Sequence, residues 1–540
     1  MTVVTLNKKE LEKSIGKITK EVEDKIVMFG TTVEENTNDN FAIEVYPNRP
    51  DLLSMQGFVR AMESYLLGKK IKEYKIEKSN TKIIVDKSVA EVRPYCMAAI
   101  VKGIKFTDEK IKEIMQWQEK LHLTVGRNRK KVALGYYDLN KIKFPVKYLT
   151  KDPKEIVFEP LDMTGELNAL QILSRHPCGR EYGKQLDGFK KFPVYYDSDN
   201  QVLSMPPIIN SNKSGKITQT TTDILVECSG TNLEALKKVI ITAVTDLIDC
   251  GGKAYSVEIE YPDKKESISL DPEKLEIKLE NINKTLGINL KEEEIPKLLE
   301  KMGIGYEKGY ALIPAYRTDI LHEADIVEEI AISYGYQNFK PEIPKISTVA
   351  EENKISILKR KLSSILTGLG LLETSSFHLT TKETIKDIYF EFKNFIEVEE
   401  SKTEYNALRI DILTNLMKIL SENSDSSYPQ KIFEIGKTFS LDEKAETGIH
   451  EEEKLAITLT NEDSNFTTIK QALDYLFKML NKEYKLEQTE HPAFITGRVG
   501  KIIVDNQEIG FIGEIAPRVL KNFKLKMPVC ALEINIKSLN

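Results

Sequence analysis

The length of the chain constrains its fold more than any single motif does. A chain of 540 residues is much longer than one hydrophobic core supports, so we expect three to five domains. Its 41% hydrophobic and 30% charged residues are typical of a globular protein, not of a disordered or fibrous one.

Apolar periodicity and turn signals divide the chain into four regions that mix helices and strands. A hydrophilic stretch, "KEYKIEKSNTKIIVDKS", is expected to be a linker after the first region, and "KPEIPK" is expected to be a linker before the last. In the last region, strands joined by turns predict an antiparallel sheet with helices on one face. The predicted fold class is therefore multidomain α+β, with regions at 1–84, 85–262, 268–345 and 350–540.

Charge and cysteine content exclude several protein classes. The chain has 77 basic and 83 acidic residues, which argues against a uniformly basic nucleic-acid binder but leaves a local basic groove possible. The five cysteines form no CxxC pair, so neither a structural zinc site nor a disulfide framework is expected. The N-terminus lacks the apolar core of a signal peptide, and no segment reaches the ~18 apolar residues of a membrane helix. We expect a cytoplasmic protein with no membrane contact.

The common catalytic signatures are missing. The "GKT" at 436–438 would need a glycine at 431 to complete a phosphate-binding loop, and that residue is Lys431. Neither "HEAD" nor "HEEE" carries the second histidine of a zinc-protease helix, and no GxSxG occurs. The residues alone therefore reveal no complete catalytic apparatus.

One acidic stretch, "YRTDILHEADIVEEIAISYGY", allows two interpretations. On a helical wheel Glu328 and Glu329 lie at about 300° and 40° from Asp325, so the three carboxylates share a face, while apolar residues cover the other. Asp319 lies in the preceding loop, and no Lys or Arg on that helix face offsets the charge. The stretch is either a solvated acidic face at a helix start or a set of oxygen ligands for a hard cation such as Mg²⁺.

Two further stretches are rich in polar side chains. "LHLTVGRNRKKVALG" places several basic residues after a helix, and "MPPIINSNKSGKITQTTTDILVECSGTN" joins a Pro-Pro turn to a run of Ser, Thr and Asn. Such a run can line a polar pocket, although it is more often ordinary turn chemistry.

Several motifs in one order resemble the β subunit of phenylalanyl-tRNA synthetase, in its archaeal and eukaryotic form. These motifs are "PNRPDLLSMQG", "LHLTVGRNRKKVALGYYDL", "PPIINS", "YRTDILHEADIVEEIAISYGY", "SKTEYNALRIDILTNL", "KIFEIGKTF" and "FIGEIAPRVL". They cover essentially the whole chain. The bacterial form differs in having an inserted oligonucleotide-binding barrel and a further anticodon-binding domain, neither of which is expected here.

The resemblance implies how the chemistry is divided between two chains. The α subunit is expected to hold the class II active site, which uses ATP to activate phenylalanine and transfers it to tRNA(Phe). Residues 350–540 are expected to resemble that catalytic fold without its motifs and to contact α in an (αβ)2 heterotetramer. The resemblance also implies that the acidic stretch binds Mg²⁺ through Asp319, Asp325, Glu328 and Glu329.

The resemblance further implies an editing module at 85–262, which hydrolyses tyrosine wrongly attached to tRNA(Phe). The pocket candidates are Leu203, Ser211, Glu227 and Ser229, with Glu227 best suited to accept a hydrogen bond from a tyrosine hydroxyl. Glu227 and Ser229 stand where the family pattern has an acid and a threonine. Arg127 and Arg129 are candidates for phosphate contact with the tRNA, or else part of a solvated loop.

A second hypothesis is a stand-alone tRNA-binding or deacylating protein without an α partner. Such a protein would not need the last ~190 residues of this chain, so their presence favours the synthetase subunit.

Overall fold

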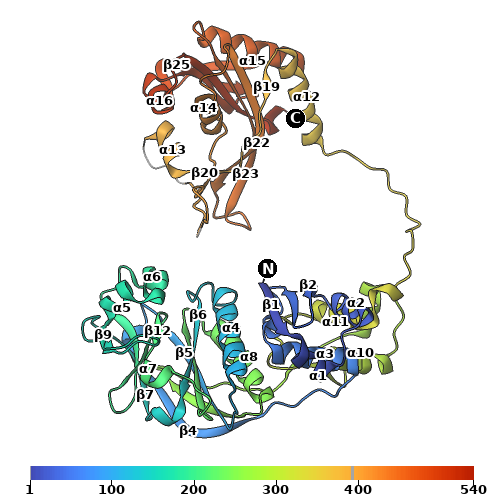
Figure 1. The fold of residues 1–540 in the computed structure, drawn as a ribbon. Coiled ribbons are helices and arrows are strands. Elements are labelled where there is room, and N and C mark those ends of the chain that lie inside the picture. Colours follow the sequence, from blue (N-terminus) through green and yellow to red (C-terminus); the bar gives the residue numbers. More distant parts are fainter. Residues whose placement is uncertain (1, 391–394, 400, 540) are drawn as a thin grey trace. The chain divides into compact units, whose positions relative to one another are not determined.

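A computed structural model describes residues 2–390, 395–399 and 401–539 of the chain (Figure 1). The chain forms two compact units, Met1–Ile343 and Pro344–Asn540, and each is described by itself. Helices and strands are mixed in several domains, which confirms the prediction of a multidomain protein with both α and β structure.

The first unit begins with a small sheet covered by helices. Its three strands pair antiparallel in the order β1-β3-β2. Ser54 caps the helix that follows by accepting a hydrogen bond from Gly57 N, and that helix ends at Gly68, whose φ of 62° suits glycine. The elements are β1 (Thr2–Asn7), α1 (Lys8–Ile15), α2 (Lys20–Met28), β2 (Thr32–Asn36), β3 (Asn40–Val45), η1 (Pro50–Leu53) and α3 (Met55–Leu67).

A ten-stranded sheet forms the middle of this unit. Its order is β12-β11-β10-β7-β4-β14-β5-β13-β6, with β15 on β14, and only β4–β14 and β4–β7 are parallel. The stretch predicted to be a hydrophilic linker is largely strand β4, because Ile83 and Val85 are buried and β4 hydrogen-bonds to strands on both sides.

The strands of this middle part are β4 (Ile76–Val85), β5 (Tyr95–Lys102), β6 (Val132–Asp138), β7 (Val146–Lys151), β8 (Val157–Phe158), β9 (Leu167–Asn168), β10 (Phe192–Tyr196), β11 (Val202–Met205), β12 (Ile209–Asn210), β13 (Ile224–Gly230), β14 (Lys253–Glu260) and β15 (Lys265–Glu266). Its helices are η2 (Lys87–Val89), α4 (Asp108–Leu123), η3 (Leu139–Lys141), α5 (Ala169–Arg175), α6 (Pro177–Tyr182), η4 (Gly183–Leu186), α7 (Asn212–Gly215) and α8 (Leu233–Asp249). The long helix α8 packs on β5 and β13.

The last part of the unit repeats the topology of the first. Its strands pair antiparallel in the order β16-β18-β17, again with two helices between the first and second strands. In both copies an arginine follows the third strand by four residues and pairs with an aspartate two residues later: Arg49 with Asp51, and Arg317 with Asp319. The elements are β16 (Glu273–Glu276), α9 (Leu279–Leu286), η5 (Glu292–Glu294), α10 (Ile295–Lys301), β17 (Gly305–Glu307), β18 (Tyr310–Ile313), α11 (Glu323–Tyr334) and η6 (Tyr336–Asn338).

Arg60 of α3 joins the three parts of this unit. Its guanidinium donates to Asp249 Oδ2 at 2.6 Å and to Asp246 Oδ1 at 3.2 Å, both on α8. The same group lies 3.9 Å from the ring centroid of Tyr316 and 5.6 Å from that of Tyr74. One buried cation therefore connects the first part of the unit, helix α8 of the middle part and the last part.

The second unit is built on a seven-stranded sheet in the order β19-β22-β23-β27-β26-β25-β24, antiparallel except for β19–β22. Helices cover both of its faces, so the prediction of helices on one face is wrong. Adjacent residues of β23 show this: Leu455 and Ile457 pack in one core with α12 and α15, whereas Ala456 packs in another with α13, α14 and α16.

The helices of this unit are α12 (Lys354–Gly368), α13 (Lys382–Tyr389), α14 (Leu413–Glu422), α15 (Phe466–Leu480), α16 (Pro517–Asn522) and η7 (Lys537–Leu539). Its strands are β19 (Leu372–Glu373), β20 (Leu379–Thr380), β21 (Ala407–Leu408), β22 (Gln430–Leu441), β23 (Ile449–Thr460), β24 (Lys485–Gln488), β25 (Phe494–Val504), β26 (Gln507–Ile515) and β27 (Val529–Asn535).

Candidate functional site: a buried glutamate in a cavity on the large sheet

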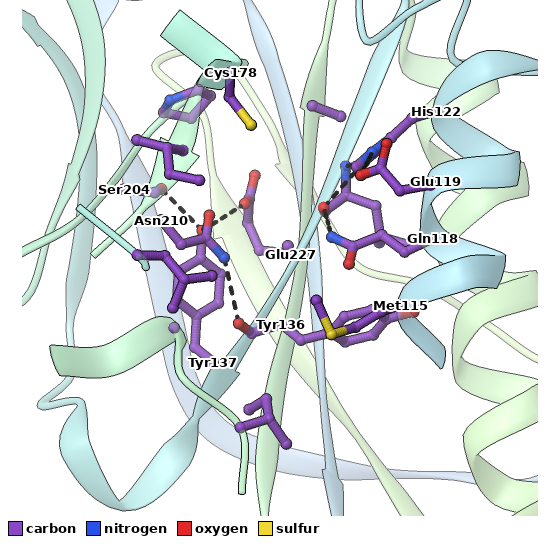
Figure 2. Close-up of a pocket in the computed structure, with 18 of the residues that line it drawn as sticks. Met115, Gln118, Glu119, His122, Tyr136, Tyr137, Cys178, Ser204, Asn210 and Glu227 are labelled. Carbon is purple, nitrogen blue, oxygen red and sulfur yellow. Dashed lines mark hydrogen bonds and ion pairs between the residues drawn. The ribbon is translucent and has the colours of Figure 1, made fainter. Parts of the chain in front are cut away.

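A cavity of about 350 Å³ lies on the face of the large sheet opposite α8. Figure 2 shows its two walls: Met115, Gln118, Glu119 and His122 come from α4, while Tyr137, Ser204 and Asn210 come from β6, β11 and β12. The carboxylate of Glu227 points into the space between them. Strand alternation explains this placement, because Cys228 bonds to Leu236 O of α8 and its neighbour Glu227 must face the other way.

Glu227 is an acid held almost entirely out of water, with 4% of its surface exposed. Burial raises its pKa to about 7, and the nearby Tyr195 and Tyr137 hydroxyls and the Arg93 guanidinium only partly oppose this rise. Its Oε2 accepts from the Tyr137 hydroxyl at 3.1 Å, whereas its Oε1 is buried with no hydrogen-bond partner among the described residues. A buried oxygen without a partner is costly, so this one is poised to accept a hydrogen bond from a ligand.

A small polar network surrounds that contact. The Tyr137 hydroxyl lies 2.8 Å from Ser204 Oγ and 3.3 Å from Asn210 Oδ1, and Asn210 Nδ2 donates to Tyr136 O at 3.4 Å. The network connects β6, β11, β12 and β13 at one end of the cavity. It gives Glu227 a fixed position among otherwise apolar strands.

The opposite wall is fixed by a second network. The backbone N–H of Leu134 donates to His122 Nε2 at 2.9 Å, which leaves the Nδ1 proton of the neutral ring for Glu119 at 3.2 Å. Burial lowers the pKa of His122, in keeping with the neutral form. Although burial opposes it, His122 and Arg129 lower the pKa of Glu119 to about 2, so this acid is ionised.

Arg129 lies in this network and not on a free surface. It donates to Glu119 Oε1 at 2.6 Å and to Ile208 O at 3.0 Å, next to the cis Pro206–Pro207 bond, and its guanidinium lies 4.3 Å from the Tyr182 ring centroid. Arg127, by contrast, is exposed. Of the two predicted tRNA contacts, only Arg127 presents its side chain to solvent.

The predicted pocket residues separate into two pairs. Glu227 and Ser229 line the cavity, whereas Leu203 and Ser211 do not, although they are neighbours in space through a 2.8 Å bond from Ser211 N to Leu203 O. Sequence reasoning missed Tyr137, Ser204 and Asn210. The available signal was the run of strand residues in "VALGYYDL", where Tyr137 alternates onto the same face as Gly135, the residue paired with Glu227.

The acidic stretch places its four carboxylates in different surroundings. Glu329 is buried, and Arg317 donates to its Oε1 at 2.6 Å and to its Oε2 at 3.1 Å. The same guanidinium donates to Asp319 Oδ2 at 2.8 Å and Oδ1 at 3.0 Å. As expected, the helix itself carries no Lys or Arg to offset this charge. The offsetting cation is Arg317, which comes from the loop before the helix.

The other two acids do not complete a ligand set. Asp325 Oδ2 accepts from Leu321 N at 2.7 Å and from His322 N at 2.9 Å, which caps α11, and Glu328 is exposed. Among the residues that the structure describes, no group of three His, Cys, Asp or Glu side chains could hold a metal ion. As arranged here, the four carboxylates do not fit a bound Mg²⁺.

None of the helices in the described part of the chain has the length and apolar character that a membrane span requires.

Comparisons with known proteins place both units. The model of the phenylalanyl tRNA synthetase beta chain CLM domain matches residues 340–536, and that of the tRNA synthetase B5 domain matches residues 275–336. A phenylalanine–tRNA ligase beta subunit of Pyrococcus horikoshii is 37% identical over 99% of both chains, and that of Archaeoglobus fulgidus is 36% identical over 100% of this chain and 98% of the relative. An N-terminal fragment of the phenylalanyl-tRNA synthetase β subunit from Pyrococcus horikoshii aligns in structure over 62% of this chain and 99% of the fragment, with a TM-score of 0.59 and 35% identity. Identity of this extent over nearly full length shows that the chain belongs to the phenylalanine–tRNA ligase β subunit family.

Proposed function

We propose that this chain works with an α subunit in an (αβ)2 heterotetramer that attaches phenylalanine to tRNA(Phe) in the cytoplasm. In this proposal the α subunit binds ATP and carries the aminoacylation site. The second unit of this chain has a structural role, as a class II-like domain without its catalytic motifs. Two observations support that role: Arg409 pairs with Glu434, and Lys454 with Glu533, so buried charges of this unit are used in holding it together.

The partner surface is proposed on the second unit, residues 350–540. Phe377 and Leu372 there are 73% and 67% exposed, which is unusual for large apolar side chains. Co-expression with α tests this proposal, because Phe377→Asp should reduce the amount of α that co-purifies. The amount of α recovered with Phe390→Asp, which changes a second exposed apolar residue of this unit, is the comparison. Recovery of this chain as a lone monomer would favour the stand-alone hypothesis.

The editing activity is proposed for residues 85–262, and the unpartnered Oε1 of Glu227 is the observation that carries it. Tyrosine differs from phenylalanine by one hydroxyl, and an apolar aminoacylation site rejects tyrosine poorly. A second site with a buried acceptor selects for that hydroxyl, because phenylalanine would leave the acceptor unpaired. The cavity offers that acceptor between polar walls, and Ser229 beside it is a further candidate.

Hydrolysis of tyrosyl-tRNA(Phe) by the purified αβ complex tests this proposal. Glu227→Ala should slow hydrolysis by at least tenfold, because the substrate hydroxyl loses its acceptor. Cys228→Ala is the matched control, since it changes the adjacent side chain on the opposite face of β13. Unchanged hydrolysis in Glu227→Ala would remove Glu227 from the site. Arg127→Ala should weaken tRNA binding in a salt-dependent way if it contacts a phosphate.

The magnesium prediction for Asp319, Asp325, Glu328 and Glu329 would need a rearrangement, since Arg317 engages two of these acids. Crystals of the αβ complex soaked in Mn²⁺ test it directly. An anomalous peak among the four carboxylates would confirm the prediction. An empty site with the Arg317 pairs intact would contradict it.

A further inference from the structure

Tyr137 reaches Glu227 only because the residue across from Glu227 has no side chain. In the register of β13 and β6, Glu227 pairs with Gly135, and Tyr137 lies two residues further along the same face. A Cβ at position 135 would lie 2.9 Å from the Tyr137 hydroxyl and 3.1 Å from Cε2 of its ring. The phenol ring therefore occupies the space over Gly135, and its hydroxyl reaches the carboxylate from there.

The protons available on each group determine which of them donates in the hydrogen bond between Tyr137 and Glu227. A tyrosine hydroxyl has one proton, and an ionised carboxylate can only accept, so the 3.1 Å contact requires Tyr137 to donate to Glu227 Oε2. Ser204 Oγ lies 2.8 Å from the Tyr137 oxygen. Because a serine hydroxyl can donate as well as accept, Ser204 can give its proton to the Tyr137 oxygen and leave the Tyr137 proton for Glu227. The chain Ser204–Tyr137–Glu227 then satisfies Oε2. Oε1 makes no hydrogen bond to a described residue, although the Tyr195 hydroxyl lies near enough to lower the pKa of Glu227, so Oε1 is left for another donor.

We propose that Tyr137 is a positioning residue: seated over Gly135, it holds Oε2 of Glu227 so that Oε1 is the acceptor offered to a substrate phenol. This inference rests on the proposed editing function. Donation by Tyr137 also favours the ionised carboxylate, which is the better acceptor. Other titratable or charged groups that interact with Glu227 are unchanged by a substitution at 137. Four of them lie on the strands around it, and the fifth, Arg93, lies in the loop before β5: Arg93, Cys96, Tyr148, Tyr195 and Cys228.

Tyr137→Phe in the αβ complex tests the proposal by activity. It should slow hydrolysis of tyrosyl-tRNA(Phe) about tenfold at pH 7 and narrow the preference for tyrosyl- over phenylalanyl-tRNA(Phe). Loss of the donor raises the pKa of Glu227, so the rate should recover as the pH rises toward 8.5. Gly135→Ala should act in the same direction while retaining the Tyr137 hydroxyl, because the new methyl group displaces the ring.

Tyr136→Phe is the matched control. It removes only the phenol oxygen of the neighbouring residue and leaves in place the backbone carbonyl that Asn210 contacts. That phenol has no hydrogen-bond partner among the described residues and interacts with Asp246 on α8, on the other side of β6 from Glu227. Its rate and pH profile should match those of the wild type. A loss in Tyr136→Phe equal to that in Tyr137→Phe would assign the effect to general disturbance of β6 and overturn the proposal.

Infrared titration gives a readout that does not depend on editing. The carbonyl stretch of protonated Glu227, assigned by its loss in Glu227→Gln, should titrate at a higher pH in Tyr137→Phe than in the wild type. If that midpoint moves but wild-type complex hydrolyses no tyrosyl-tRNA, the positioning contact stands and the proposed function fails. If the midpoint does not move, the inference is overturned whatever the activity.

Discussion

Glu227 makes the stability of the fold around the cavity depend on pH. Burial raises its folded-state pKa to about 7 from an ordinary value near 4.5, so the folded protein holds this proton over a range in which the unfolded chain has lost it. The protonated form therefore contributes stability that is fully present below pH 4.5 and is lost as the pH rises to about 7. The same acid that offers an acceptor near neutral pH weakens the fold there.

Glu227→Gln should remove this pH dependence. Relative to wild type, the variant should gain stability as the pH rises from 4.5 to 7 and then level off, by about 3 kcal/mol at most. Thermal unfolding at several pH values measures the difference. Glu280→Gln, exposed on α9, should differ little from wild type at each pH. A constant difference between Glu227→Gln and wild type over this range would contradict the raised pKa.

Arg317 is the second residue whose removal should have a large effect. Arg317→Met would leave Asp319 and Glu329 buried without their shared cation, which typically costs about 3–5 kcal/mol. Differential scanning calorimetry should show a lower melting temperature for the first unit. Arg360→Ala, which breaks an exposed pair with Glu352, should leave the melting profile unchanged. Equal melting profiles for both variants would contradict the structural role of Arg317.

At the scale of single elements, periodicity predicted the helix of the acidic stretch, but it could not assign the charged partners of that helix. The helix of the acidic stretch forms as expected, with Ile326 and Ile330 buried. The wheel placed Glu329 on one face with Asp325 and Glu328, however, whereas the structure buries Glu329 against Arg317, twelve residues earlier in the chain. A helical wheel describes one element alone, and the loop that returns over α11 lies outside it. The same limit hid Tyr137, because its partner Glu227 is on another strand.

The contact of α3 with α8 gives an element-scale prediction. Burial raises the pKa of Asp246 to about 7, and Arg60 is the cation that opposes this. Arg60→Met should therefore destabilise the first unit by about 3–5 kcal/mol and increase hydrogen exchange at the C-terminal end of α8. Lys69→Ala, in an exposed pair with Glu63, is the control and should leave exchange at α8 unchanged. Normal protection of α8 in Arg60→Met would show that apolar packing alone holds these elements together.

At the scale of the whole molecule, the "KPEIPK" linker was predicted from its prolines alone, and the structure divides the chain there, at Ile343/Pro344. The predicted division between residues 84 and 85 falls within strand β4 (Ile76–Val85), which belongs to the large sheet. This strand looks hydrophilic in isolation and is recognised only by its pairing with β14 and β7. The repeated topology of the first and third parts was also hidden, because the two copies share little beyond an Arg-x-Asp turn.

The linker gives the last prediction. Residues 340–353 are exposed and carry no secondary structure, so trypsin should cut after Lys345 before it cuts either unit. Mass spectrometry should identify two fragments that begin and end near this site, each with its own melting transition. Lys345→Gln should slow their appearance. Early cuts inside either unit would contradict the division.

The linker also has a consequence for assembly. A flexible segment of this length spans roughly 20 Å on average, which keeps each unit near the other at an effective concentration in the millimolar range. If both units contact the same partner, docking of one makes docking of the other nearly intramolecular. Two individually weak contacts then act together with high avidity, and cutting one exposed peptide bond would be enough to lose it.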